Sequence, residues 1–297
     1  MSKLLNQFIK YTLCLSITVI MLLAANRIAY AANYYAAPTA LGTEDCSSEE
    51  NACTIATAVT TANASETDDT INLAVGTYSV GATLEITDPV NLIGAGRGLD
   101  PTTATILVPS GSFNTITLTC PDLDNDFEIS GITIQAYYQK TAIYITDGTT
   151  SSSPTIKDNL IISAHPTNLP YYGIYAYDTG SSIPLKIDGN IFAGFYSEAV
   201  YLYGSGGSCS APVTSDADCA VVKNNIFNQN TNPYNGTGSN RIVYNNIVTG
   251  NVGTGINVYA RWWAQADNNY VINNTVYGNV DSFGSSGIKS NQATGTY

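Results

Sequence analysis

The chain has 297 residues, of which 11 are Lys or Arg and 23 are Asp or Glu, so its formal net charge is −12. So few cations on an acidic chain exclude nucleic acid as a principal partner, because a phosphate backbone is bound through clustered Lys and Arg. A disordered chain is also excluded, since only 11% of the residues are charged while 44% are hydrophobic. The abundance of Gly (25) and Tyr (21) favours an all-β protein over a helical one.

The first 31 residues are predicted to be a signal peptide. Lys3 and Lys10 accompany an apolar run over residues 12–25, and residues 29–31 (Ala-Tyr-Ala) supply the small-x-small pattern that a signal peptidase recognises. The run is shorter than the roughly 20 residues that a membrane-spanning helix needs. We therefore expect cleavage after Ala31, export to the periplasm, the cell surface or the medium, and no membrane span in the mature chain. Its net charge would be −15, from 8 cations and 23 acidic residues.

Five cysteines remain beyond the predicted cleavage site, and four of them form two pairs that are close in sequence. In an exported protein such pairs suggest disulfides. We therefore expect the bonds Cys46–Cys53 and Cys209–Cys219, each of which would close a short loop rich in Ser and Asp. Cys120 is then left over, and we interpret it as a buried cysteine of a strand.

The start of the mature chain, residues 32–69, is expected to form an N-terminal cap. Within residues 54–64, apolar side chains recur at helical spacing. A short amphipathic helix at this point would cover the open end of a stacked β-structure, which otherwise exposes unpaired strand edges. The apolar positions of this helix are Ile55, Ala58, Val59 and Ala62.

Short strand-like runs bounded by turn residues follow the cap. The residues that carry a resemblance are Tyr34–Pro38, the predicted helix, Asp69–Leu73, Gly76–Tyr78, Leu84–Ile86 and Val90–Gly96. Together they resemble the N-terminal cap and first coils of right-handed parallel β-helix proteins, the pectin-lyase-like superfamily. The resemblance covers roughly residues 33–292 and implies that fold. It implies no single activity, because the superfamily includes polysaccharide lyases, glycoside hydrolases, epimerases and adhesins.

One recurring segment places an Asn between two strand-like runs. The spacing of these Asn residues varies between 21 and 35, with no helical pattern between the strands. Such a repeat predicts an all-β fold, a single-stranded right-handed parallel β-helix over residues 70–297. We expect its C-terminal end to be truncated or uncapped. We expect the Asn side chains to stack at a bend whose left-handed backbone Asn tolerates, and an earlier copy has Gly131 in their place. The stacked residues are Asn159, Asn190, Asn225, Asn246 and Asn274.

A second recurring segment carries tyrosines. Aligning its copies with Ile143, Ile174, Val200 and Ile256 inward predicts two neighbouring tracks of outward phenol rings. The rings could stabilise the sheet by stacking, or they could bind a long sugar chain or a protein. The only two Trp of the chain directly follow Arg261, and they too could either pack against the protein or bind a sugar. The candidate substrate-binding residues are Tyr175, Tyr177, Tyr201, Tyr203, Tyr259, Arg261, Trp262 and Trp263.

Carboxylates occupy every second position at Asp122, Asp124 and Asp126. Such a segment could wrap a Ca²⁺ ion in a loop, or it could form a solvated face of an extended chain. A helix-loop-helix calcium site is excluded, because the Gly at its sixth position and the Glu at its twelfth are missing. We therefore expect no required cofactor, with Ca²⁺ as a candidate ion.

Two classes of function fit these observations. We favour a secreted or surface-exposed, adhesin-like module that binds carbohydrate or a cell-surface partner and has no assignable chemistry. The alternative is an enzyme acting on polysaccharide, most plausibly a lyase, which would need cations around an acidic sugar on a chain that has few. The motifs of the superfamily's hydrolases, Gly-His-Gly and Asn-Thr-Asp, do not occur. A groove in which Arg241, Arg261 or a Lys meets two or more carboxylates would favour the lyase.

Overall fold

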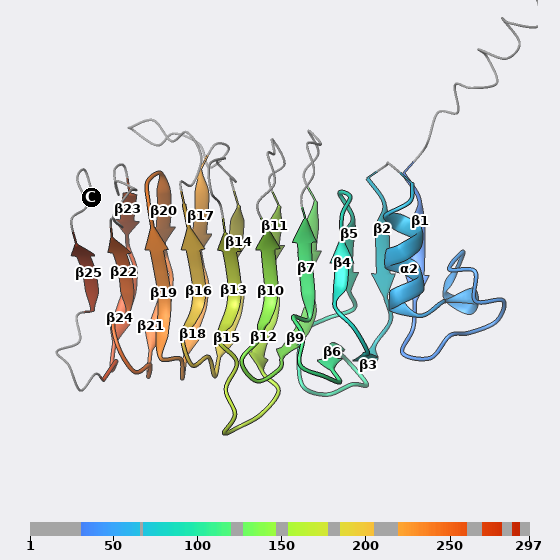
Figure 1. Cartoon of the computed structure of the whole chain (residues 1–297), viewed down its shortest axis with the longest axis horizontal. Coiled ribbons are helices and arrows are strands. Elements are labelled where there is room, and N and C mark those ends of the chain that lie inside the picture. The colour runs from blue at the N-terminus through green and yellow to red at the C-terminus, as the bar shows by residue number, and fades with distance from the viewer. Residues whose placement is uncertain are drawn as a thin grey trace, which may run out of the picture. The chain divides into compact units, whose positions relative to one another are not determined.

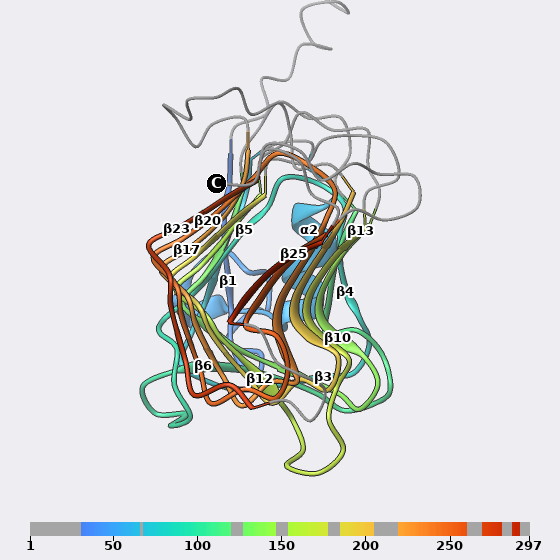
Figure 2. The same ribbon diagram turned by 90° about the vertical axis from the view of Figure 1, so that its left-hand side faces the viewer.

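Three parallel β-sheets, named A, B and C below, wind around a common axis (Figure 1). The computed structural model describes residues 31–65, 68–119, 127–146, 154–177, 185–204, 219–259, 269–280 and 287–291. In each coil the chain passes from sheet A through sheet B to sheet C, and equivalent strands of successive coils pair in parallel. Seen from the C-terminal end, the chain turns counterclockwise as it approaches the viewer, so the β-helix is right-handed (Figure 2).

Each sheet takes one strand from each coil. Sheet A consists of β1 (Asn33–Ala36), β2 (Thr70–Leu73), β5 (Asn91–Gly94), β8 (Glu128–Ser130), β11 (Thr155–Lys157), β14 (Lys186–Asp188), β17 (Ala220–Lys223), β20 (Arg241–Tyr244) and β23 (Asn269–Ile272). Sheet B consists of β3 (Gly76–Val80), β6 (Thr105–Pro109), β9 (Ile132–Ala136), β12 (Leu160–Ser163), β15 (Ile191–Ala193), β18 (Ile226–Asn228), β21 (Ile247–Thr249) and β24 (Thr275–Tyr277). Sheet C consists of β4 (Leu84–Ile86), β7 (Ile116–Thr119), β10 (Thr141–Thr146), β13 (Tyr172–Tyr177), β16 (Glu198–Tyr203), β19 (Asn232–Thr237), β22 (Ile256–Tyr259) and β25 (Ile288–Asn291).

The core is a set of columns, because register in a parallel stack places the same strand position of each coil above the last. Sheet A contributes a column of aliphatic side chains, and sheet B adds Phe192 on Phe227 with ring centroids 5.0 Å apart. These side chains are almost completely withdrawn from water, which supplies the main favourable term in folding. The column of sheet A is Ile71, Leu92, Ile129, Ile156, Ile187, Val222 and Val243. The three parallel sheets confirm the predicted parallel β-helix.

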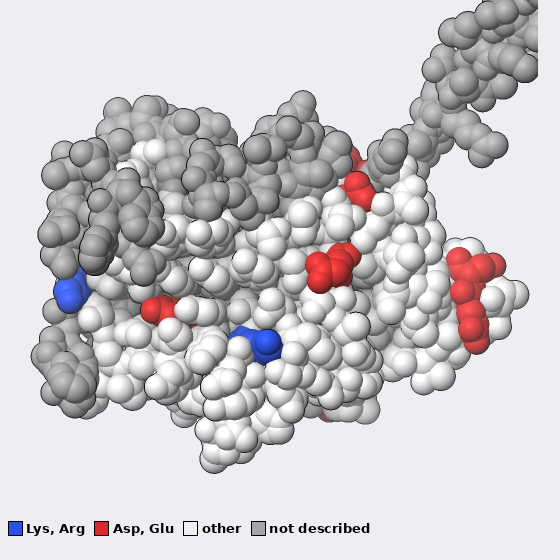
Figure 3. Space-filling model, in the orientation of Figure 1, with Lys and Arg blue, Asp and Glu red and all other residues white. Residues whose placement is uncertain are grey.

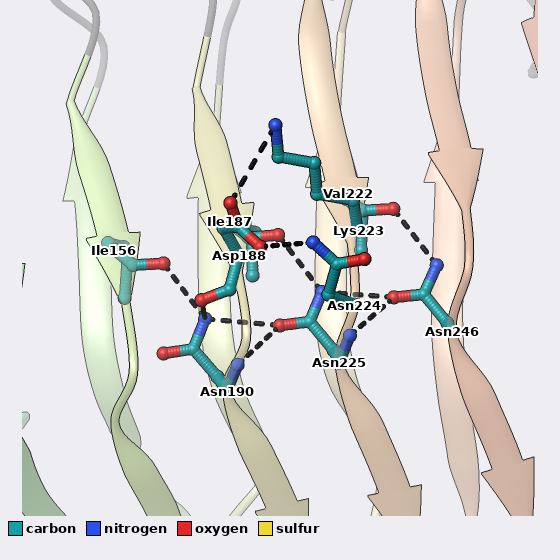
Figure 4. A network of polar contacts seen from close by, with 9 residues as sticks. All are labelled: Ile156, Ile187, Asp188, Asn190, Val222, Lys223, Asn224, Asn225 and Asn246. Atoms are coloured by element: carbon teal, nitrogen blue, oxygen red, sulfur yellow. Dashed lines mark hydrogen bonds and ion pairs between the residues drawn. The ribbon is translucent and has the colours of Figure 1, made fainter.

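The predicted Asn ladder lies at the bend between sheets A and B and is confirmed (Figure 4). Asn190 shows the pattern: its Nδ2 donates to Asn225 Oδ1 at 3.1 Å and to the carbonyl of Ile156 at 2.8 Å. The Asn225 Oδ1 also accepts the backbone N–H of Asn190, at 2.8 Å. Since Asn190 and Asn225 are fully buried, the ladder satisfies backbone groups that would otherwise be costly to bury.

Two details of the predicted bend are wrong. The left-handed residue is the one before each ladder Asn, with φ between 52° and 68° at Asp158, Gly189, Asn224, Asn245 and Asn273. The ladder side chain must point inward to reach its neighbours, so the bend itself is made one residue earlier. In the earlier copy, Gly131 (φ 68°) accordingly aligns with the left-handed position. Ile132 takes the ladder position and donates its backbone N–H to Asn159 Oδ1 at 3.0 Å.

A second, shorter Asn ladder lies between sheets B and C and was not predicted. Asn230 Nδ2 donates to Asn251 Oδ1 at 3.1 Å, and Asn251 Nδ2 donates to Asn279 Oδ1 at 2.9 Å. A left-handed residue again precedes each Asn, namely Gln229, Gly250 and Gly278. The two bends thus use the same device, although only the first stands out in the sequence.

The N-terminal cap contains η1 (Glu49–Asn51) and the helix α2 (Ile55–Ala62), which confirms the predicted helix and its four buried residues. The helix begins after Thr54, whose side-chain oxygen accepts the backbone N–H of Thr57 at 3.2 Å. At the other end, the side chain of Asn63 holds β4 to the helix: it donates to the carbonyl of Glu85 at 2.7 Å and accepts the N–H of Thr87 at 3.1 Å.

The predicted disulfide Cys46–Cys53 is present. It belongs to a loop that closes the free edge of β1, because Tyr35 donates to the carbonyl of Cys46 and accepts the N–H of Cys53, each at 3.0 Å. Cys219 is also disulfide-bonded, and its predicted partner Cys209 lies outside the described residues, as does Cys120.

Candidate functional site

The outer face of sheet C carries the predicted tyrosines in columns. The rings of Tyr144, Tyr175 and Tyr201 stack along the axis, with centroids 5.5 and 5.3 Å apart. Tyr177 and Tyr203 stack beside them at 4.9 Å, with planes 11° apart. From β7 to β25, the first outward column is Thr117, Tyr144, Tyr175, Tyr201, Asn235, Asn257 and Lys289.

Stacking has a consequence for what these rings can bind. A ring between two stacked neighbours has both faces covered, so it presents only its edge and its hydroxyl to the outside. Tyr201 is only 8% exposed, although its Cα partners Tyr175 and Asn235 show that it lies on the outward column. Tyr172 packs against Tyr175 as well, with centroids 4.8 Å apart. The tyrosines therefore form a small external hydrophobic cluster that is edged by hydroxyls.

The predicted track of tyrosines is interrupted by β19, a strand that the sequence alignment missed. Its residues Asn235 and Thr237 follow Tyr201 and Tyr203, so Thr237 separates Tyr203 from Tyr259. The segment Asn-Pro-Tyr-Asn-Gly-Thr reads as a turn rather than a strand because of its Pro and its Asn-Gly pair. The structure uses it as a strand with Tyr234 pointing into the core. Gly236 makes room for that ring, since a Cβ there would lie 2.5 Å from the Tyr234 hydroxyl oxygen.

A polar relay begins where the tyrosine stack ends. Asn257 Nδ2 donates to Asn235 Oδ1 at 3.3 Å, and Asn235 Nδ2 donates to Glu198 Oε1 at 3.1 Å. The Ser197 hydroxyl donates to the other carboxylate oxygen of Glu198. The relay places one carboxylate and two amides beside Tyr172 and Tyr201, so aromatic rings and hydrogen-bonding groups lie next to each other on this face. Glu198 was not predicted, because a single Glu at the start of a strand carries no pattern.

Two phenols of this surface, Tyr172 and Tyr175, are held in the neutral form at physiological pH. Burial is the largest cause that raises the pKa of Tyr175, to about 12, and the neighbouring tyrosines add to it. Burial and then the Glu198 carboxylate raise the pKa of Tyr172. These hydroxyls can therefore donate and accept hydrogen bonds, but they are poorly suited to act as bases.

Charged groups gather instead on the outer face of sheet A. Lys157 Nζ lies 2.7 Å from Glu128 Oε2, and Lys223 Nζ lies 3.7 Å from Asp188 Oδ2. The Asn224 side chain donates to the second oxygen of Asp188 at 2.7 Å (Figure 4). The hydrogen bond from Lys157 to Glu128 is the largest cause that raises the pKa of Lys157. In contrast, Figure 3 shows few charged groups among the described atoms on the outer face of sheet C.

Among the described residues, Arg241 contacts backbone carbonyls and no carboxylate. It is 2% exposed, and its Nη2 donates to the carbonyls of Thr237 (2.5 Å), Gly204 and Leu202. The guanidinium thus holds together the corner at which β19 turns into β20. Arg261, which the same prediction named, lies outside the described residues.

Other predicted site residues also lie outside the described ranges. They are Trp262 and Trp263 of the sugar-binding hypothesis, and Asp122, Asp124 and Asp126 of the calcium hypothesis. Within the described ranges, no three His, Cys, Asp or Glu side chains come together as a metal site would require. No helix there has the length and apolarity needed to cross a bilayer.

No protein-family model matches the chain, and neither does any curated protein at a significant level. Among solved structures, the chain matches the crystal structure of an alginate lyase from Paenibacillus sp. str. FPU-7. The match covers 78% of this chain and 97% of the lyase chain, with 14% sequence identity and a TM-score of 0.24. Neither value supports carrying an activity from one protein to the other. The class of protein that the sheets themselves define is a right-handed parallel β-helix with an aromatic outer face.

Proposed function

We propose that this protein is an exported module that binds polysaccharide along the outer face of sheet C. The observation that carries the proposal is the direct continuation of the Tyr144–Tyr175–Tyr201 stack into the relay of Glu198, Asn235 and Asn257. Hydroxyl-rich polymers are recognised by such a row of phenol edges, amides and a carboxylate, because each can exchange hydrogen bonds with sugar hydroxyls.

The geometry of the columns suits an extended polymer. Successive coils repeat every ~4.8 Å along the axis, which is comparable to the length of one sugar residue in an extended chain. A polysaccharide lying along the axis would therefore meet one outward side chain of this column at each sugar residue, first the tyrosines and then the amides. Few cations lie among the described residues of this face, which favours a neutral polymer over a polyuronate. A disulfide in the cap is compatible with export.

Binding of a panel of neutral and acidic polysaccharides by the mature chain tests this proposal. We expect the triple variant Tyr177→Ala, Tyr203→Ala and Tyr259→Ala to weaken binding of the preferred polymer, and Glu198→Gln to weaken it about tenfold, the effect of losing one hydrogen bond to a charged group. Lys157→Ala on sheet A is the matched control and should bind normally. Unchanged binding in both sheet C variants, with a lower Tm in the triple variant, would assign the tyrosines to stability alone.

A polysaccharide lyase is the second candidate, and one observation favours it: Lys157 and Lys223 meet Glu128 and Asp188 on one face. Removal of a proton beside a uronate carboxylate requires a base whose pKa lies near the working pH. Lys157 has a raised pKa and so remains an ammonium group, which suits neutralisation of the carboxylate but not proton removal. Ultraviolet absorbance of unsaturated products on a panel of uronates, with and without Ca²⁺, distinguishes the two functions. Product formation that is lost in Lys157→Ala would overturn the purely binding role.

A further inference from the structure

Asp69 lies beside Ala32, close to the first described residue, and its side chain is completely buried. One carboxylate oxygen accepts the backbone N–H of Ala32 at 2.7 Å, and the hydroxyl of Ser65 donates to the other. Burial, followed by the adjacent Asp69, raises the pKa of Tyr34. A carboxylate withdrawn from water in this way is costly unless charged or strongly polar groups compensate it.

The backbone fixes Ala32 beside Asp69. Ala32 directly precedes β1, and its carbonyl accepts the N–H of Thr70 at 2.9 Å. The carbonyl of Asp69 in turn accepts the N–H of Asn91 at 2.8 Å. Ala32 and Asp69 therefore form the position before the first pair of the β1–β2 ladder, Asn33 with Thr70. The start of sheet A therefore holds Ala32 next to the carboxylate.

Ala32 is also the residue that the predicted signal-peptide cleavage would make the first of the mature chain. The compact unit begins at Ala31, which is exposed. Hydrolysis of the Ala31–Ala32 amide by a peptidase consumes one water. It leaves a carboxylate on Ala31 and an amino group on Ala32, which takes up a proton at neutral pH because its ordinary pKa is about 8.

We propose that the α-ammonium group released on Ala32 by this cleavage pairs with the buried carboxylate of Asp69 and completes the N-terminal cap. The proposal rests on the predicted cleavage site and is independent of the polysaccharide-binding role. A neutral N–H···O contact becomes a charge-assisted one, which is roughly twice as strong. Only cleavage directly before Ala32 can form this pair. If the mature chain began one residue earlier, Ala32 would keep its amide, and if it began one residue later, the nitrogen of Ala32 would be absent. Processing at this bond thus stabilises the end of the β-helix that α2 covers.

The test compares one chain before and after cleavage. Residues 1–31 are replaced by a short leader that ends in the site of a protease leaving Ala32 as the first residue. We expect the Tm to rise by about 2 °C on cleavage, the shift that about 1 kcal/mol gives in a chain of this size. The rise should disappear in Asp69→Asn and persist in Asp68→Asn, because the Asp68 side chain is exposed. The Tm of each variant after cleavage is compared with the Tm of the same variant before cleavage. A general destabilisation by Asp69→Asn therefore does not affect the comparison.

A second measurement needs no variant of Asp69. Acetylation of the cleaved wild-type chain at Ala32 removes the charge, and we expect it to reverse the gain in Tm. The rate of reductive methylation at Ala32, followed by mass spectrometry, should be lower in the folded than in the unfolded chain, because the pairing with Asp69 shields the amino group. An unchanged Tm on cleavage and acetylation, or a native mature chain that starts at another residue, would overturn the proposal.

Discussion

The outer faces of sheets A and C belong to the same coils and the same register, yet they are built from opposite kinds of residue. On sheet C, identical side chains follow one another: Tyr144, Tyr175 and Tyr201 stack in one column. On sheet A, Lys157, Asp188 and Lys223 follow one another, so the sign of the charge alternates. Both columns obey the same physical condition, because every side chain in a parallel stack has its equivalents as nearest neighbours.

The difference between the two faces shows which residue types can repeat in such a column. Tyrosine and asparagine attract their own kind, through ring stacking and through an amide that both donates and accepts. Lysine and aspartate repel their own kind and must alternate. The rings on the face of sheet C can therefore pack densely and be partly buried, while the charged side chains of sheet A stay open to water. In the pair Lys157–Glu128 the side chains are 41% and 27% exposed.

The largest expected effect is a loss of stability when a ring is removed from the outer face of sheet C. Replacing Tyr201 by Ala removes a ring that is 8% exposed and lies between Tyr175 and Tyr203. We expect a loss of about 3 kcal/mol in the free energy of unfolding, as for other buried aromatic side chains. Tyr201→Phe keeps the stack and should cost less than half as much. Denaturant titration followed by tyrosine fluorescence measures both, and equal losses in the two variants would show that the hydroxyl, not the stack, matters.

An effect of intermediate size is the pH dependence of stability, which we expect to come from sheet C and not from sheet A. The pKa of Tyr175 is raised to about 12 in the folded chain, above the value of about 10 in an unfolded chain. The folded state thus favours the neutral phenol, so this contribution is complete below pH 10 and is lost as the pH rises towards 12. We expect the denaturation midpoint to fall over this interval, together with an increase in absorbance from tyrosinate. Tyr175→Phe should lessen the fall, whereas Lys223→Met on sheet A should leave the absorbance change intact.

The contrast also shows what a sequence can predict. The ladder Asn residues and the helix positions Ile55 and Val59 follow from period and residue type, which local physics imposes directly. Strand β19 was missed because Tyr234 and Gly236 compensate each other in the core, and such a pair is visible only when the coils are stacked. Glu198 was missed for the same reason, since its role comes from Asn235 in the next coil, 37 residues away. Of the columns made of one residue type, the long ladder through Asn190 could be predicted from sequence, whereas the short ladder of Asn230, Asn251 and Asn279 was missed. The columns made of complementary types were missed as well.

The smallest expected effect concerns the ion pair of Lys157 with Glu128. Both side chains are partly exposed, so water and salt screen the attraction although the atoms are only 2.7 Å apart. In a double-mutant cycle of Lys157→Met and Glu128→Gln, we expect a coupling of about 0.5 kcal/mol at low salt that falls towards zero at 1 M salt. A coupling above 2 kcal/mol that resists salt would mean that the charges of sheet A are as well shielded as the tyrosines of sheet C. In that case alternation of charge would stabilise a solenoid face as effectively as self-stacking does, and the two faces would differ in chemistry but not in strength.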